Sequence, residues 1–190
     1  MIEILTNEYR QVRLPADGEG VELDMGCGKG KFTLELAQRY PGRVILASDV
    51  MLGRLRRIEQ KVLHRGLTNI RLLRAESAAL AEFQLPLHCI DRLHILCPDP
   101  WPKDKKRIRR LVSAAFLGLL PRIMRPRGIV HMSTDHQPYF EDWQRLLQTI
   151  PFLQPAPEGI ADVRDLKTDF ELQWEAMGKT VGHLSYRVML

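Results

Sequence analysis

Short apolar runs alternate with helical patterns along most of the chain. Five runs of apolar residues, many of them β-branched, predict buried strands at residues 20–25, 43–49, 69–75, 89–97 and 128–134. Five stretches with apolar residues at helical spacing predict helices at residues 31–40, 52–66, 77–83, 109–124 and 139–147. Strands and helices that take turns in this way are typical of a parallel sheet with helices on both faces. We therefore expect an α/β fold.

The pattern weakens after residue 150. A connector rich in Pro and Gly is followed by one more β-like piece at residues 183–189. This region is too short for a separate domain, and the chain contains no internal repeat and no low-complexity tract. We therefore expect residues 1–190 to form a single domain.

Composition excludes several classes of protein. No apolar run approaches the roughly 18 residues needed to span a bilayer, and the first residues, MIEILTNEYRQVRL, include acids where a secretory signal has a basic region. We therefore expect a cytoplasmic protein that does not bind membranes. The three cysteines, Cys27, Cys89 and Cys97, lack metal-ligand spacing, so we predict neither a disulfide framework nor a metal site. The formal charge of +5 permits a polyanionic partner.

A glycine-rich turn, DMGCGKG, occupies residues 24–30, directly after the first predicted strand. Glycines at the carboxyl end of a strand let the backbone approach a ligand closely. A phosphate-binding P-loop is excluded because Met25 stands at its first glycine and Phe32 at its Ser or Thr. A dinucleotide-binding turn, and with it a nicotinamide-dependent dehydrogenase, is disfavoured because Lys31 stands where a small residue is needed.

Acidic residues follow four successive predicted strands. Asp24 suits a ligand that carries an amine, such as the methionine portion of S-adenosylmethionine, and Asp49 is placed to accept hydrogen bonds from a ribose diol. Glu76 follows the third strand, where an adenine would lie, and Asp99 follows the fourth. One such acid is more often a helix cap or a turn residue, but four of them beside a glycine loop favour a binding site. The predicted cofactor-binding residues are Asp24, Gly26, Gly28, Gly30, Asp49, Glu76 and Asp99.

The segment CPDPWPKDKKRIRRL, residues 97–111, combines three prolines with six basic residues. Proline neither extends a central strand nor sits inside a helix, so this segment is expected to be a stiff loop that fixes Asp99 and Trp101. Cations at a helix start oppose the helix dipole, which favours a ligand for the basic residues over a solvated helix start. A second basic cluster, residues 54–65, is interpreted as the solvated face of an amphipathic helix.

These stretches together resemble the bacterial tRNA (guanine-N7-)-methyltransferases, within the class I S-adenosylmethionine-dependent methyltransferases. DMGCGKG resembles that family's EIGFGMG, and PDPWPK with the following basic residues and RRL resembles its PDPWxK segment. STD at residues 133–135 resembles its ATD, and TDFE at residues 168–171 resembles its TxFE. The similarity runs from about residue 22 to the end, where Gly178 and Gly182 fit a closing G-x-x-x-G.

The resemblance implies a Rossmann-like class I methyltransferase fold. Its sheet would be mostly parallel and seven-stranded, with an antiparallel last strand, a short amino-terminal segment at residues 1–19 and substrate-side elements at residues 151–190. It also implies S-adenosyl-L-methionine as the cofactor and tRNA as the partner. The product would be N7-methylguanosine in the variable loop, formed without a metal by a monomer or a homodimer.

The residues themselves and the resemblance together suggest individual roles, of which the guanine contacts of Asp135, Thr168 and Glu171 come from the resemblance. Asp99 would be the catalytic residue that orients the guanine or the cofactor amine, and Trp101 would pack the loop or stack on a base. Substrate contacts would come from Lys103, Asp135, Thr168, Phe170 and Glu171. The RNA backbone would be held by Lys105, Lys106, Arg107, Arg109 and Arg110.

Alternatives remain at several of these positions. Asp135 is also placed to cap a helix that begins near Gln137, and Trp101 is also suited to fill the core. The six histidines form no motif, and none is assigned a catalytic task. The sequence departs from the family pattern at several positions. Asp24, Asp49 and Glu76 stand at positions where the family usually has Glu, Glu and Asp. Lys105 and Lys106 stand where it usually has Arg and His, and His136 stands where an aromatic or polar residue is usual.

Two other functions are compatible with the same residues. One is a methyltransferase of this fold that acts on another RNA or on a small molecule, which the nearly absent amino-terminal extension would favour. The other is an RNA-binding module whose cofactor site has decayed. Binding of S-adenosylmethionine and the identity of the methylated product separate these readings.

Overall fold

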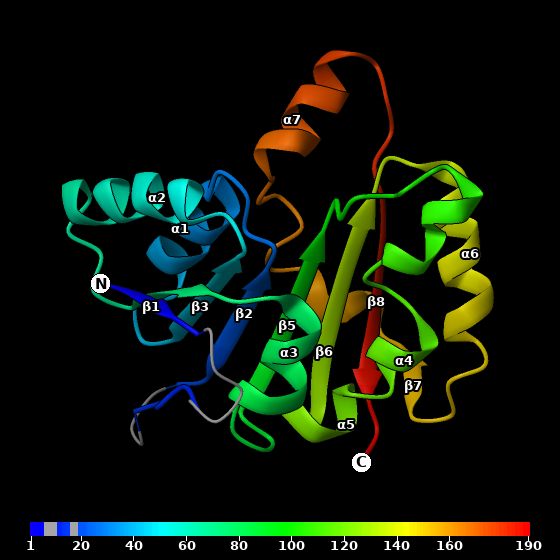
Figure 1. Cartoon of the computed structure of the whole chain (residues 1–190), viewed down its shortest axis with the longest axis horizontal. Helices are drawn as coiled ribbons and strands as arrows, with labels where there is room; N and C mark the ends of the chain where they lie inside the picture. Colours follow the sequence, from blue (N-terminus) through cyan, green and yellow to red (C-terminus); the bar gives the residue numbers. More distant parts are fainter. Residues whose placement is uncertain (6–10, 16–18) are drawn as a thin grey trace.

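The computed structural model describes residues 1–5, 11–15 and 19–190 (Figure 1). Residues 6–10 and 16–18, part of the predicted amino-terminal segment 1–19, lie outside the described residues. The described strands are β1 Ile2–Ile4, β2 Val21–Met25, β3 Val44–Asp49, β4 Ile70–Arg74, β5 Ile90–Leu96, β6 Met124–Thr134, β7 Leu153–Pro155 and β8 Gly182–Val188. They form one sheet in the order β1-β4-β3-β2-β5-β6-β8-β7.

The sheet is parallel except at one side. β8 runs antiparallel to both β6 and β7, whereas the other neighbouring strands are parallel. This arrangement confirms the predicted α/β fold with an antiparallel last strand. The described part of the chain has eight strands rather than the predicted seven, because Ile2–Ile4 pair with the edge of β4. A three-residue run is too short for its alternation to be recognised in the sequence.

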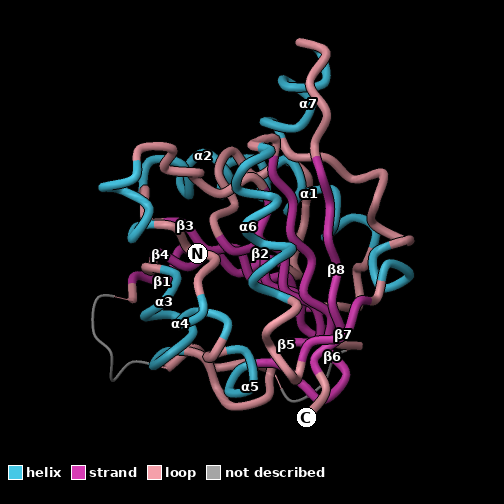
Figure 2. Tube along the Cα trace, turned by 90° about the vertical axis from the view of Figure 1, so that its right-hand side faces the viewer, coloured by secondary structure: helices cyan, strands magenta, loops and turns pink. Residues whose placement is uncertain are grey.

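Helical segments cover both faces of the sheet, as predicted. They are α1 Lys31–Arg39, α2 Leu52–His64, α3 Ser77–Ala79, the π-helix η1 Leu80–Gln84, the 3-10 helix η2 Asp104–Arg109, α4 Ala114–Leu117, α5 Leu120–Ile123, α6 Gln137–Leu147, the 3-10 helix η3 Pro157–Ile160 and α7 Asp169–Ala176. The helix α7 projects beyond the edge at which the parallel strands end (Figures 1 and 2). Among the described residues, no helix is long and apolar enough to cross a membrane.

Two helix predictions need correction, and one helix was not predicted. The single helix expected at residues 109–124 is wrong: Arg109 ends η2, and two short helices follow, the first capped by the Ser113 side chain and the second with Pro121 in its first turn. The helix expected at residues 77–83 continues from α3 as a π-helix. The helix α7 was missed because its buried residue is Glu171 rather than an apolar stripe.

The two faces of the sheet differ in polarity. On one face, Leu23 and Leu93 join a large apolar cluster beneath α4, α5 and α6. Strand residues alternate between faces, so the neighbours of these leucines point to the opposite side, where α1 packs. That side carries buried polar residues, among them Glu22, Arg92 and His94.

Candidate active site

The glycine loop after β2 adopts a backbone that other residues rarely adopt. Gly26, Gly28 and Gly30 have φ angles of 81°, 57° and 81°. A Cβ atom on Gly30 would lie 2.6 Å from Cγ1 of Ile58 in α2, so this position has no room for a side chain. The loop therefore turns from β2 into α1 within a few residues and leaves its backbone facing the end of the sheet.

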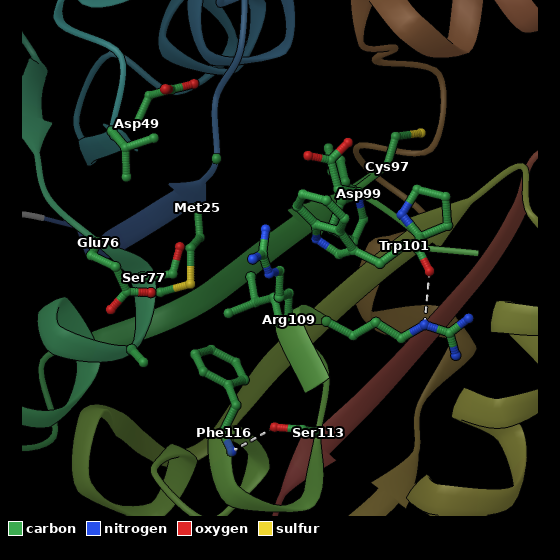
Figure 3. Close-up of a pocket in the computed structure, with 18 of the residues that line it drawn as sticks. Met25, Asp49, Glu76, Ser77, Cys97, Asp99, Trp101, Arg109, Ser113 and Phe116 are labelled. Carbon is green, nitrogen blue, oxygen red and sulfur yellow. Dashed lines mark hydrogen bonds between the residues drawn. The ribbon is translucent and has the colours of Figure 1, made fainter. Parts of the chain in front are cut away.

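A cavity of about 980 Å³ opens at the carboxyl ends of the parallel strands (Figure 3). Asp49 and Glu76 lie on one side of it, and Asp99 and Trp101 lie on the other (Figure 3). The predicted residues that line it are Gly26, Gly28, Asp49, Glu76, Asp99, Arg109, Arg110, Asp135 and Phe170. The tertiary structure thus brings together acids that are far apart in the sequence.

Asp24 lies beside this cavity rather than on its wall. It lines a smaller pocket of about 20 Å³ next to Gly28 and Phe170. Its carboxylate accepts a hydrogen bond from the Thr33 hydroxyl. Burial raises the pKa of Asp24 to about 7, and the nearby Asp49 charge acts in the same direction.

Asp49 holds the glycine loop and the start of α2. Its Oδ2 accepts from the Gly28 backbone N–H at 3.2 Å, and its Oδ1 accepts from the Met51 N–H at 2.7 Å. Arg54 Nη1 lies 3.3 Å from Oδ2. Glu76 caps α3 by accepting from Ala79 N–H at 2.8 Å, so this acid is a helix cap as well as a cavity residue.

The proline loop after β5 begins and ends with unusual backbone. Cys97 and Trp101 have φ angles of 49° and 40°. Asp99 is exposed between them and lines the cavity. The indole of Trp101 is half-buried at the cavity wall, with Lys106 and Arg109 at 5.6 and 5.3 Å from the ring centre, so it does not fill the core.

The six basic residues of this segment differ in solvent exposure. Lys103, Lys105, Lys106, Arg107 and Arg109 are exposed on or beside η2. The Arg110 side chain is only 8% exposed; it donates to Pro100 O at 2.7 Å and to Asp142 Oδ2 at 2.8 Å. Arg110 therefore holds the loop in place, and the exposed cations of this segment are the other five.

The predicted substrate residues are only partly brought together, at the end of β6 and the start of α7. Asp135 and Phe170 line the large cavity, Thr168 lines the small pocket beside it, and Glu171 is buried and lines neither. Asp135 lines the cavity, and the cap of α6 is His136, whose Nδ1 accepts from Tyr139 N–H at 3.2 Å. The alternative that Asp135 caps this helix is therefore wrong. Thr168 caps α7 by accepting from the Glu171 N–H at 3.0 Å.

Three contributors to the site were missed in the sequence. Trp174 lines the cavity from α7, a helix without a recognisable pattern. Arg54 pairs with Asp49, whereas the sequence pattern predicts a solvated helix face for its cluster. His183 contacts Glu171 with 2.8 Å between Nε2 and Oε1, and only the pairing of β8 with β6 brings it there.

Comparison with known proteins places this arrangement in a family. The profile of a family described as "Putative methyltransferase" matches residues 19–184. The tRNA (guanine-N(7)-)-methyltransferase of Nitrosospira multiformis is 32% identical over 167 residues, which are 87% of this chain and 73% of that protein. The chain belongs to the tRNA (guanine-N(7)-)-methyltransferase family. The enzyme of that name from Thermus thermophilus is 31% identical over 169 residues, 86% of this chain but 52% of the relative.

Solved structures confirm the fold. The 16S rRNA methyltransferase KamB superposes with a TM-score of 0.67 at 21% identity, covering 92% of this chain and 90% of that chain. The aminoglycoside resistance methyltransferase NpmB1 superposes with a TM-score of 0.64 at 17% identity, covering 92% and 89%. The predicted Rossmann-like methyltransferase fold is thus present in this family member.

Proposed function

We propose that this family member transfers a methyl group from S-adenosyl-L-methionine to N7 of a guanosine in tRNA, in the variable loop. The observation that carries the proposal is the convergence of the glycine loop, Asp49 and Glu76 on one cavity with Asp99 and Asp135. One half of that cavity suits a nucleoside with an amino acid chain, and the other half suits a purine. Arg109, the last residue of η2, lines the same cavity.

The residues present fit the cofactor. Gly26 and Gly28 expose backbone, Asp49 has carboxylate oxygens for ribose hydroxyls, and Glu76 lies on the side where the adenine would lie. Asp24 and Asp99 supply carboxylates for the amine. When bound, S-adenosyl-L-methionine supplies a methyl group whose C–S bond breaks, with the electron pair left on sulfur, as the N7 lone pair forms the new C–N bond.

The protein's part in this reaction is positioning. Guanine N7 already carries an exposed lone pair, so no general base is needed, and correct alignment is worth on the order of 7–11 kcal/mol. Asp99 orients the guanine, and its charge favours the purine as N7 becomes cationic. Asp135, Thr168 and Glu171 hold the guanine edge, where the carboxylates accept hydrogen bonds from N1–H and N2–H.

The RNA is held by the exposed cations. Lys103 binds the phosphate of the target nucleotide, and Lys105, Lys106, Arg107 and Arg109 bind neighbouring phosphates. Phe170 is 39% exposed at the cavity and is available to contact the base. A cytoplasmic monomer or homodimer is consistent with a tRNA substrate.

The test is methylation of bulk tRNA with labelled cofactor, followed by borohydride and aniline cleavage to locate N7-methylguanosine. Asp99→Asn and Asp135→Asn should each lower kcat/KM by about 100-fold at unchanged Tm. Glu141→Gln, on the exposed side of α6, is the matched control. Wild-type rates in both aspartate variants, or label without cleavage at guanosine, would overturn the proposal. Absence of cofactor binding by calorimetry would instead favour a decayed site.

A further inference from the structure

Five buried side chains form one continuous hydrogen-bonded chain that runs from β2 across β5, β6 and β8 to α7. Glu22 Oε2 lies 2.8 Å from His94 Nε2, and His94 Nδ1 lies 3.0 Å from His131 Nδ1. His131 Nε2 lies 3.0 Å from His183 Nδ1, and His183 Nε2 lies 2.8 Å from Glu171 Oε1. The chain thus connects an interior carboxylate on β2 with the carboxylate proposed above to hold the guanine.

Strand order explains how these residues meet. β2, β5, β6 and β8 are consecutive neighbours in the sheet, and His94 stands directly opposite His131. Water is excluded from this row, because His94 and His131 are at most 1% exposed and the His183 side chain is 5% exposed. The ring of Phe32 covers the two inner histidines edge-on, at 4.8 and 6.5 Å between ring centres.

The hydrogens available to this hydrogen-bonded chain of side chains can be counted. Its four hydrogen bonds need four hydrogens, and each neutral imidazole carries one N–H. The three histidines therefore supply three hydrogens, and ionised carboxylates supply none. The fourth hydrogen comes either from a fourth proton, on an imidazolium or on a carboxyl group, or from Arg164, whose Nη1 lies 2.9 Å from His183 Nε2 and can donate to that nitrogen.

The Glu22 end is already charge-balanced. Arg92 donates to both carboxylate oxygens of Glu22, at 3.0 and 2.8 Å, and Arg43 also pairs with it. Burial alone would raise the pKa of Glu22, but the hydrogen bonds from His94 and Arg92 outweigh it and hold the pKa well below its ordinary range. Glu22 is thus an acceptor, and His94 donates to it from Nε2.

This sets the direction of the remaining links. His94 Nδ1 is then the acceptor for His131 Nδ1–H, and His131 Nε2 is the acceptor for His183 Nδ1–H. Burial lowers the pKa of both His94 and His131, so neither holds the additional proton. Asp162 and Arg92 also face His94, and Arg164 also faces His131.

We propose that the fourth proton is held between His183 Nε2 and Glu171 Oε1, and that His183 is the positioning residue that fixes Glu171 for guanine. Arg164 Nη1 also faces this junction, 2.9 Å from His183 Nε2 and 3.6 Å from Glu171 Oε1. Among the described residues, Glu171 Oε2 is buried and has no hydrogen-bond partner. With Oε1 engaged by His183, Oε2 is the carboxylate oxygen left for a guanine N–H, although Glu171 is buried and lines neither of the two cavities described above; this role rests on the proposed function, whereas the geometry of the hydrogen-bonded chain does not.

The proton arrangement is tested by two-bond proton–nitrogen NMR spectra of the full chain labelled with nitrogen-15 at histidine, recorded from pH 6 to 9. We expect His94 protonated at Nε2, His131 protonated at Nδ1, and His183 protonated at Nδ1 with a further hydrogen between its Nε2 and the Glu171 carboxyl group. In Glu171→Gln the amide supplies that hydrogen, so the further proton should be absent. The reverse pair of tautomers, or a wild type in which Arg164 is the donor to His183 Nε2 and no further proton is present, would overturn the proposal.

The positioning role is tested by kinetics. His183→Ala should raise KM for tRNA roughly tenfold, with kcat and the dissociation constant of S-adenosylmethionine much less affected. His183→Gln retains a donor for Glu171 and should recover part of the loss. His64→Ala, on the exposed face of α2, is the matched control. Equal KM values and equal pH profiles in wild type and His183→Ala would refute the role, whereas an inactive wild type would refute the proposed function instead.

Discussion

The carboxylate of Asp49 accepts a hydrogen bond from the backbone N–H of Gly28, so the end of β3 holds the glycine loop that follows β2. The same side chain also fixes the first turn of α2 through the Met51 N–H. One acid therefore shapes two walls of the proposed cofactor site. The length of the Asp49 side chain matters, because a glutamate carboxylate would lie one methylene farther from the backbone and would contact the Gly28 N–H in a different geometry.

Loss of the Asp49 carboxylate should weaken cofactor binding. We expect Asp49→Ala to raise the dissociation constant of S-adenosylmethionine at least about tenfold, since two backbone donors lose their acceptor and the ribose loses its partner. Asp49→Glu keeps the charge and should lose less. Calorimetry measures both, with Glu141→Gln as the control. Equal affinity in Asp49→Ala would show that the ribose lies elsewhere.

The buried Asp24 should make stability depend on pH. Its folded pKa of about 7 exceeds the ordinary value of 3.8, so its contribution to the free energy of unfolding is full below about pH 4 and is lost as the pH rises to about 7. Asp24→Asn removes this group. We expect the difference in Tm between pH 5 and pH 8 to be more positive in the wild type than in the variant. Parallel Tm profiles would contradict the raised pKa.

Two glycines should respond oppositely to alanine. Gly30→Ala combines a φ of 81° with a contact of 2.6 Å to Ile58, so it should destabilise the fold by about 2–5 kcal/mol. Gly53 lies in α2 with nothing within 4 Å of an added Cβ, so Gly53→Ala should stabilise by about 0.5–1 kcal/mol. Urea unfolding of both variants measures the contrast. A stable Gly30→Ala protein would contradict the close packing of the loop on α2.

The basic residues of segment 97–111 should fall into two groups, those that bind RNA and Arg110, which stabilises the fold. Lys105→Gln should weaken tRNA binding and reduce the slope of log K against log salt by about 1, at unchanged Tm. Arg110→Met should instead cost about 2 kcal/mol of stability, because its hydrogen bonds to Pro100 and Asp142 are lost. Filter binding over a salt series and thermal denaturation distinguish the two. A normal Tm in Arg110→Met would contradict the structural role of Arg110 and favour a role in RNA binding.

Local pattern was enough to predict most of the site. Strands end where apolar alternation stops, so the positions of Asp24, Asp49, Glu76 and Asp99 at strand ends follow from the sequence. Parallel strands end at a common edge, which is why three of these acids share one cavity while Asp24 lies just beside it. Glycine spacing and the prolines similarly specify loops, because their backbone restrictions are local.

Side-chain contacts between residues that are far apart in the sequence could not be predicted from local pattern. His94, His131 and His183 are 37 and 52 residues apart along the chain and share no motif, yet neighbouring strands place them in one hydrogen-bonded row. In the sequence, Arg110 cannot be told apart from its basic neighbours. Only the fold shows that its side chain donates hydrogen bonds to Pro100 and Asp142. Periodicity reports which residues face inward, but which side chain meets which depends on strand order and register, and these are decided by the packing of the whole chain.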